Sequence, residues 1–169
     1  MNEAVITEMK RVLDLQKQLQ INEGAPSLQL RKDRLDRCVA MIKKYQEKVI
    51  LALQEDFGNR DQIMGVMTEV ESSIGSLKHA KKNMKKWIKP LKRKPEVPGL
   101  GSLISLLGAK AWIEYQPKGT VGVISPWNFP VNLILMPLAG IFAAGNRAMI
   151  KPSEITPSTS SLIQEMFKE

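Results

Sequence analysis

The stretch Gly119-Thr-Val-Gly-Val-Ile-Ser-Pro-Trp-Asn-Phe-Pro130, continued to Lys151-Pro-Ser-Glu154, decides the fold. Its apolar run from Val121 to Ile124 is closed by Ser125-Pro126, which is typical of a short buried strand. Residues 131–144 are apolar almost throughout and are followed by Gly145, which predicts a helix packed against a sheet. Residues 148–150 then predict a second strand, so the stretch is one β-α-β unit.

Polar residues follow both predicted strands. Trp127 and Asn128 lie in the turn after the first strand, and Lys151 and Glu154 come at the end of the second. In open α/β sheets, ligands bind outside the carboxyl ends of the strands. We therefore expect these two clusters to meet at one edge of the sheet and to form a ligand site there.

Three motifs in this region carry a resemblance to a known family. They are Ser125-Pro-Trp-Asn-Phe-Pro130, Ala144-Gly-Asn-Arg147 and Ile150-Lys-Pro-Ser-Glu154. In this order and spacing the sequence resembles the NAD(P)-dependent aldehyde dehydrogenase superfamily. Upstream, Leu35-Asp-Arg37, Glu55-Asp-Phe-Gly58 and Ile113-Glu-Tyr-Gln-Pro117 are similar to the branch that contains coniferyl aldehyde dehydrogenases. The resemblance runs from about Ser27 to the end of the chain, whereas family members are much longer.

The resemblance implies an incomplete α/β fold. We expect a helical N-terminal part with a connector over residues 1–110. Residues 111–169 would then supply the first β-α-β-α part of a Rossmann-like dinucleotide-binding parallel sheet. The catalytic domain of the family would be absent, and with it the nucleophilic cysteine and the general-base glutamate. The resemblance thus implies that the chain is the N-terminal portion of an enzyme that oxidises an aldehyde, such as coniferyl aldehyde, to a carboxylic acid. It also implies that this chain alone is inactive.

Asn128 is the candidate catalytic residue. In this family a thiolate attacks the aldehyde carbonyl, and an oxyanion forms. A side-chain amide directed at that oxygen stabilises the developing charge. By resemblance Asn128 supplies the amide; the alternative is an ordinary turn residue, because asparagine is common in turns.

Lys151 and Glu154 are the candidate cofactor-binding pair. By resemblance they bind the two ribose hydroxyls of NAD, one side chain donating and the other accepting hydrogen bonds. A carboxylate there disfavours a 2′-phosphate, so NAD is preferred, with NADP as the alternative. An ion pair in solvent is the competing interpretation. Four further residues are expected to line the same cleft: Ile124, Pro126, Trp127 and Ser153.

The single cysteine and the single histidine are not expected to be catalytic. Cys38 falls on or beside the apolar face of a predicted helix, where a buried thiol is inert. His79 lies among lysines and is expected at the surface. One cysteine and one histidine do not supply a metal site.

Composition and charge restrict the partners and the cellular compartment that are expected for this chain. The chain has 169 residues and a net charge of +8, and nine of its positive charges fall between Lys78 and Lys94 without an acid. Such a run is more often a solvated face than a nucleic-acid site, so no nucleic-acid partner is expected. The sequence has no signal peptide or membrane span, and one cysteine suits a reducing compartment, so we expect a cytoplasmic protein. By resemblance, the full-length protein would form a homo-oligomer. The alternatives are a non-catalytic interaction or polyanion-binding module, or a truncated chain without a function of its own.

Apolar spacing and turn residues predict the remaining elements. Helices are expected over residues 2–20, from Ser27 as N-cap to about Phe57, over 60–88 and over 157–169. A strand is expected over 111–116, after a connector at 95–110.

Overall fold

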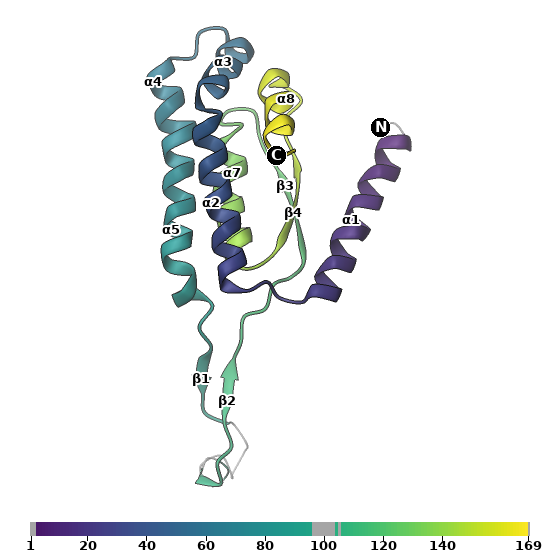
Figure 1. Cartoon of the computed structure of the whole chain (residues 1–169), viewed down its shortest axis with the longest axis vertical. Coiled ribbons are helices and arrows are strands. Elements are labelled where there is room, and N and C mark those ends of the chain that lie inside the picture. Colours follow the sequence, from purple (N-terminus) through teal and green to yellow (C-terminus); the bar gives the residue numbers. More distant parts are fainter. Residues whose placement is uncertain (1–2, 96–103, 105, 169) are drawn as a thin grey trace.

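The computed structural model describes residues 3–95, 104 and 106–168. Strand β3 (Thr120–Ile124) pairs in parallel with β4 (Arg147–Lys151), and helix α7 (Asn132–Ala143) connects them. The expected β-α-β unit is therefore confirmed, and the predicted α/β fold with an incomplete sheet is correct. Figure 1 shows the two strands side by side, with α7 along one side of them.

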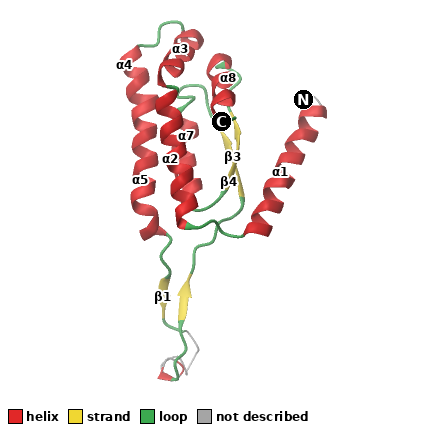
Figure 2. Ribbon diagram, in the orientation of Figure 1, coloured by secondary structure: helices red, strands yellow, loops and turns green. Residues whose placement is uncertain are grey.

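A layer of helices covers the outer face of α7. Helices α2 (Leu28–Lys44) and α5 (Ser72–Trp87) pack against it and against each other. Apolar side chains from all three helices are fully buried between them, including Leu35, Leu77 and Leu138. Helices dominate the chain, and the strands form two separate pairs (Figure 2). Among the described residues, no helix has both the length and the apolar character needed to cross a bilayer.

Two further helices complete the contacts around the β-α-β unit. Helix α8 (Pro157–Met166) packs on α3 (Gln46–Phe57), and Asp56 of α3 accepts hydrogen bonds from the backbone N–H groups of Ser158 and Thr159 at 2.9 and 2.8 Å. A side chain from another helix thus satisfies the first turn of α8. Helix α1 (Glu3–Glu23) contacts the strands, and its Gln16 Nε2 donates to the carbonyl of Ala148 at 3.1 Å.

Two predicted helices are interrupted. The pattern predicted one helix from Ser27 to Phe57, but it ends at Tyr45 and α3 begins anew. The buried Tyr45 ring packs in the core, and a backbone ψ of 5° there breaks the helix without disturbing the apolar spacing. The region predicted as one helix over 60–88 contains α4 (Gln62–Gly65), the π-helix η1 (Val66–Glu71) and α5. The Ser27 N-cap is confirmed, because its side chain accepts from the Leu30 N–H at 3.2 Å.

The strand predicted at 111–116 is shorter and has an unexpected partner. It spans Ala111–Ile113 (β2) and pairs antiparallel with β1 (Leu91–Arg93), a strand that the sequence analysis missed. Lys92 lies opposite Trp112 in this pair. The two strands extend away from the helical layer as an arm (Figure 1). Residues 96–103 and 105 of the predicted connector lie outside the described part of the chain.

The turn between α7 and β4 depends on Gly145 and Arg31. Gly145 has a φ of +85°, and a Cβ built there would lie 2.8 Å from the Arg31 guanidinium carbon. Arg31 is buried, and its Nη1 and Nε donate to the carbonyls of Ala143 and Pro26 at 3.1 and 2.9 Å. The guanidinium group therefore occupies the space that only a glycine leaves free at this turn.

Replacement of Gly145 by alanine is expected to lower the free energy of unfolding by about 1–3 kcal/mol, because it adds backbone strain and a clash with Arg31. Urea unfolding of the chain measures this change. Gly75→Ala is the matched control, since Gly75 is helical and an added Cβ would meet no atom within 4 Å beyond the adjacent backbone of its own helix. That control should stabilise the chain or leave it unchanged. Equal effects of the two replacements would contradict the assignment.

Candidate functional site

The two polar clusters start at neighbouring points of the same sheet edge. Ile124 and Lys151 are the last paired residues of β3 and β4. Immediately beyond them, the Ser125 N–H donates to the carbonyl of Lys151 at 3.0 Å. The turn after β3 and the turn after β4 therefore leave the sheet side by side, at the carboxyl ends of both strands.

The first turn presents Asn128 to solvent on a fixed backbone. Ser125 is buried, and its hydroxyl is shared between the carbonyls of Pro126 and Pro130 at 3.3 and 3.4 Å. Asn128 is exposed, and Trp127 next to it is half exposed. The side chain of Asn128 is thus accessible to a ligand from solvent, while hydrogen bonds within the turn hold the backbone around it.

Arg60 contacts this turn from the helical layer. Its Nη2 donates to the backbone carbonyl of Asn128 at 2.9 Å. The guanidinium group lies 4.5 Å from the ring centroid of Phe57 and 5.1 Å from that of Phe129. Cations over aromatic faces are attracted to the ring electrons. Phe57 also contacts Trp127, with ring centroids 6.4 Å apart.

Glu69 lies beneath the turn and is completely buried. Its Oε2 accepts from the backbone N–H groups of Val131 and Asn132 at 3.1 and 2.8 Å, at the start of α7. Its Oε1 lies 3.5 Å from Nη1 of Arg60. Burial raises the pKa of the Glu69 carboxyl, while the two backbone donors and Arg60 oppose that change.

The second turn presents an ion pair. Lys151 and Glu154 are both exposed, and the Lys151 ammonium group pairs with the Glu154 carboxylate. Hydrogen bonding to Lys151 lowers the pKa of Glu154. Ser153 is buried, and its hydroxyl accepts from the Ile155 N–H at 3.2 Å. Lys151 and Glu154 therefore reach solvent, whereas Ser153 stabilises the turn that carries them.

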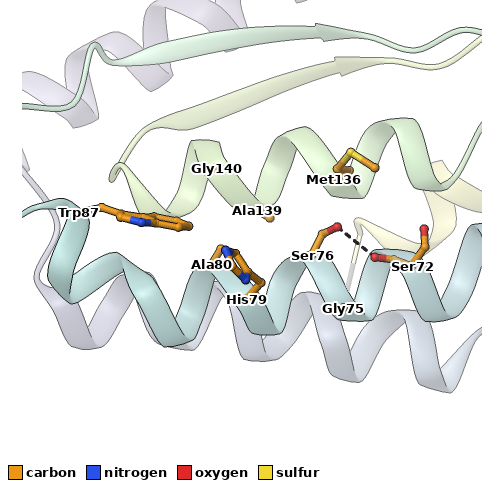
Figure 3. Close-up of a pocket in the computed structure, with 9 residues that line it drawn as sticks. All are labelled: Ser72, Gly75, Ser76, His79, Ala80, Trp87, Met136, Ala139 and Gly140. Carbon is orange, nitrogen blue, oxygen red and sulfur yellow. Dashed lines mark hydrogen bonds between the residues drawn. The ribbon is translucent and has the colours of Figure 1, made fainter.

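Ile124 and Pro126, the other predicted lining residues, are exposed at the same edge, and the Ile124 side chain is 81% accessible. A groove of about 410 Å³ lies elsewhere in the described part of the chain, between α5 and α7, and contains Ser72, Ser76, His79, Trp87 and Met136 (Figure 3). None of the predicted site residues lines it.

Cys38 and His79, which the sequence predicted to be non-catalytic, lie at the buried and exposed positions expected for them. Cys38 is buried, and burial raises its pKa to about 11, so its thiol remains protonated at neutral pH. His79 is exposed on α5, with its ring 5.7 Å from that of Trp87. Seven lysines of the basic run are also exposed: Lys78, Lys82, Lys85, Lys86, Lys89, Lys92 and Lys94.

Comparison with known proteins identifies the family. Residues 14–169 match the model of the aldehyde dehydrogenase family. The chain belongs to the aldehyde dehydrogenase family. A probable coniferyl aldehyde dehydrogenase from Caulobacter vibrioides is 51% identical over 94% of this chain and 32% of its own length. Coniferyl aldehyde dehydrogenase from Pseudomonas sp. strain HR199 is 44% identical over 95% of this chain and 31% of its own length.

A solved structure shares the fold of this aldehyde dehydrogenase chain. The substrate-bound state of Staphylococcus aureus AldH superimposes with a TM-score of 0.82 at 32% identity, over 98% of this chain and 33% of that one. The chain therefore spans about a third of the length of the relatives that it matches.

Arg60 and Glu69 are the residues of this region that the sequence did not predict. Glu69 is separated from Asn132 by 63 positions, and Arg60 from Asn128 by 68. The residues around Arg60 and Glu69 have the mixed apolar and charged spacing that is usual in an amphipathic helix. The available signal was the acid at position 69 between the apolar residues Val66 and Val70, which places a carboxylate near the buried face.

We expect the buried Glu69 carboxylate to make unfolding of this aldehyde dehydrogenase chain pH-dependent. A carboxyl with a raised pKa in the folded state contributes stability below its unfolded pKa, and loses that contribution as pH rises through the folded pKa. Glu69→Gln should therefore gain stability relative to the unchanged chain as pH rises from about 4.5, its ordinary pKa.

Urea unfolding at a series of pH values between about 4 and 8 measures this difference. Glu71→Gln, at an exposed position of the same helical segment, is the matched control. A difference between Glu69→Gln and the unchanged chain that stays constant with pH would contradict the role of burial.

Proposed function

We propose that this chain is the N-terminal portion of an NAD-dependent aldehyde dehydrogenase that oxidises an aldehyde to a carboxylic acid. The observation that carries the proposal is the pairing of the two turns at one sheet edge. The Asn128 turn and the Lys151–Glu154 turn leave neighbouring strands at the hydrogen bond between Ser125 and Lys151. The Asn128 turn would contact the reacting carbonyl of the aldehyde, and the Lys151–Glu154 turn would bind the cofactor.

In this proposal Asn128 stabilises the oxyanion that forms when the aldehyde is attacked. Its side chain is exposed at the sheet edge, and its backbone is fixed by Ser125 on one side and Arg60 on the other. A donor that is already oriented needs no rearrangement when charge develops on the substrate oxygen. The attacking thiol would be supplied by a part of the family fold that this chain does not contain.

Lys151 and Glu154 would bind the adenosine ribose. The residues present fit a diol, because an exposed ammonium donor and an exposed carboxylate acceptor lie together and pair with each other. The exposed apolar residues Ile124, Pro126 and Trp127 would cover the nucleotide at the same edge, with Ser153 supporting the turn. NAD, when bound, accepts the hydride from the substrate. The carboxylate favours NAD over NADP through charge repulsion with a 2′-phosphate.

The proposed substrate class is coniferyl aldehyde or a similar aldehyde. It is supported by the names of the two relatives from Caulobacter vibrioides and Pseudomonas, which are 51% and 44% identical to this chain. We further propose that residues 1–110 and 111–169 are the helical part and the start of the dinucleotide-binding part. The full-length protein is proposed to be a cytoplasmic homo-oligomer.

Asn128→Ala is expected to lower kcat by about 100-fold or more, the loss expected for one oxyanion donor. The measurement uses a chimera in which this chain replaces the matching third of the Caulobacter vibrioides relative, and follows NADH formed from coniferyl aldehyde. Asn22→Ala is the matched control, because Asn22 is exposed in α1 away from the site, and it should leave kcat unchanged.

The chimera should be active and the 169-residue chain alone inactive. A folded chimera that forms no NADH, or an isolated chain that does, would contradict the proposed function. An unchanged kcat in the Asn128→Ala chimera would contradict the role of the amide alone.

Glu154→Ala is expected to weaken binding of NAD to the chain by about tenfold, because one of the two side chains on the ribose diol is lost. Binding of NADP should weaken less, so that preference for NAD declines. Thermal-shift titrations of the chain with each nucleotide measure both effects. Glu47→Ala removes an exposed acid from α3 and serves as the control. Equal losses of NAD affinity in Glu154→Ala and Glu47→Ala would contradict the assignment of Glu154 to the ribose.

A further inference from the structure

The Asn128 turn receives a contact from outside the β-α-β unit. Arg60 lies just before α4, in a connection between helices of the N-terminal part, yet its Nη2 donates to the carbonyl of Asn128 at 2.9 Å. The bond reaches the backbone of the residue whose side chain the proposed function uses. A change in the position of Arg60 would therefore move the Asn128 backbone and, with it, the amide.

Arg60 itself has little freedom to move. Its side chain is 16% exposed and contacts the rings of Phe57 and Phe129 at 4.5 and 5.1 Å. Its other terminal nitrogen lies 3.5 Å from the Glu69 carboxylate, which is fully buried. The planar guanidinium group thus donates a hydrogen bond to Asn128 from one terminal nitrogen while the other stays in ionic contact with Glu69, which an ammonium group on a flexible stem does less well.

Glu69 is fixed in turn by the helix that follows the Asn128 turn. It accepts both backbone N–H groups at the start of α7, and it is itself part of the π-helix η1. Single π-turns inside helices recur at functional sites, because they shift which side chains face a neighbour. Arg60 thus binds Asn128 on one side of Phe129, and Glu69 binds Val131 and Asn132 on the other.

We propose that Arg60, oriented by Glu69, is a positioning residue that fixes the Asn128 turn in the geometry required for oxyanion stabilisation. The inference rests on the proposed function for its catalytic consequence. The competing explanation is purely structural: Arg60 neutralises a buried carboxylate, and its bond to Asn128 has no effect on the reaction. The two explanations differ in what happens when the charge on Glu69 is removed together with Arg60.

The first experiment compares Arg60→Met with the double variant Arg60→Met/Glu69→Gln in the chimera. Arg60→Met leaves a buried carboxylate unpaired and should lower both the unfolding temperature and kcat, the latter by about 10- to 100-fold, as expected for a displaced catalytic group. Glutamine at position 69 can still accept from the start of α7, so the double variant should regain stability. If Arg60 positions the turn, kcat stays low in the double variant. Recovery of kcat together with stability would overturn the proposal.

A double-mutant cycle then asks whether Arg60 acts through Asn128. In the Asn128→Ala background, Arg60→Met should reduce kcat by less than about twofold, because the amide that Arg60 positions has gone. The KM for NAD should remain unchanged throughout, since Arg60 bonds to Asn128 and pairs with Glu69, and contacts neither Lys151 nor Glu154 within the part of the chain that the structure describes. The same 10- to 100-fold loss in both backgrounds would overturn the proposal.

A second experiment on the 169-residue chain needs no activity. The ¹⁵N order parameter of Asn128 should fall from about 0.85 to below about 0.6 in Arg60→Met, while that of Val123 in β3 stays high. An unchanged order parameter at Asn128 would overturn the proposal even if the chimera is active. A third outcome separates the two proposals. If Asn128→Ala leaves kcat unchanged but Arg60→Met lowers the order parameter of Asn128, the role of Asn128 in the reaction is contradicted, whereas the role of Arg60 in fixing the turn is supported.

Discussion

The structure depends on a carboxylate buried at the start of a helix. Helix α7 begins with Val131 as its N-cap residue, which offers no side-chain acceptor for the first backbone N–H groups. Glu69 supplies that acceptor from another helix, with bonds of 3.1 and 2.8 Å. Unpaired N–H groups and the positive end of the helix dipole both favour a negative charge at this point. The position of α7, and of the turn that precedes it, is therefore set by the helical layer.

The opposite end of α7 has the complementary arrangement. Arg31 donates from Nη1 to the carbonyl of Ala143, the last residue of the helix, at 3.1 Å. Asn146, just beyond, accepts the Gly119 N–H with its side chain at 3.0 Å and connects the beginnings of the two strands. Since α7 has no charged residue of its own, charges of opposite sign from α2 and η1 fix its two ends. This arrangement couples the helical part to the β-α-β unit more specifically than apolar packing alone.

The sequence predicted the parts of this arrangement that are local. Apolar runs bounded by glycine and proline located β3, α7 and β4, and the polar clusters after each strand were correctly expected at one edge. Continuous apolar spacing hid the break at Tyr45, because the same residues remain buried on both sides of it. Strand β1 is a run of three exposed residues with lysine and arginine, so it had no periodic signal. Glu69 and Arg60 were missed because their partners are more than 60 positions away, and a charged residue on a helix is ordinarily solvated.

The site therefore separates two kinds of residue by exposure. Asn128, Lys151 and Glu154 reach solvent, while Ser125, Ser153 and Glu69 are buried and hydrogen-bonded beneath them. Exposed side chains make few contacts within the chain, so packing rules give no reason for their identity, and only the motif indicated a role. Buried polar groups without partners would destabilise the fold, so each requires a specific neighbour. Arg60 connects the two kinds, since it pairs with the buried Glu69 carboxylate and donates a hydrogen bond to the backbone of the exposed Asn128. That double contact lets a stabilising interaction of the helical layer determine the geometry of the turn that carries Asn128.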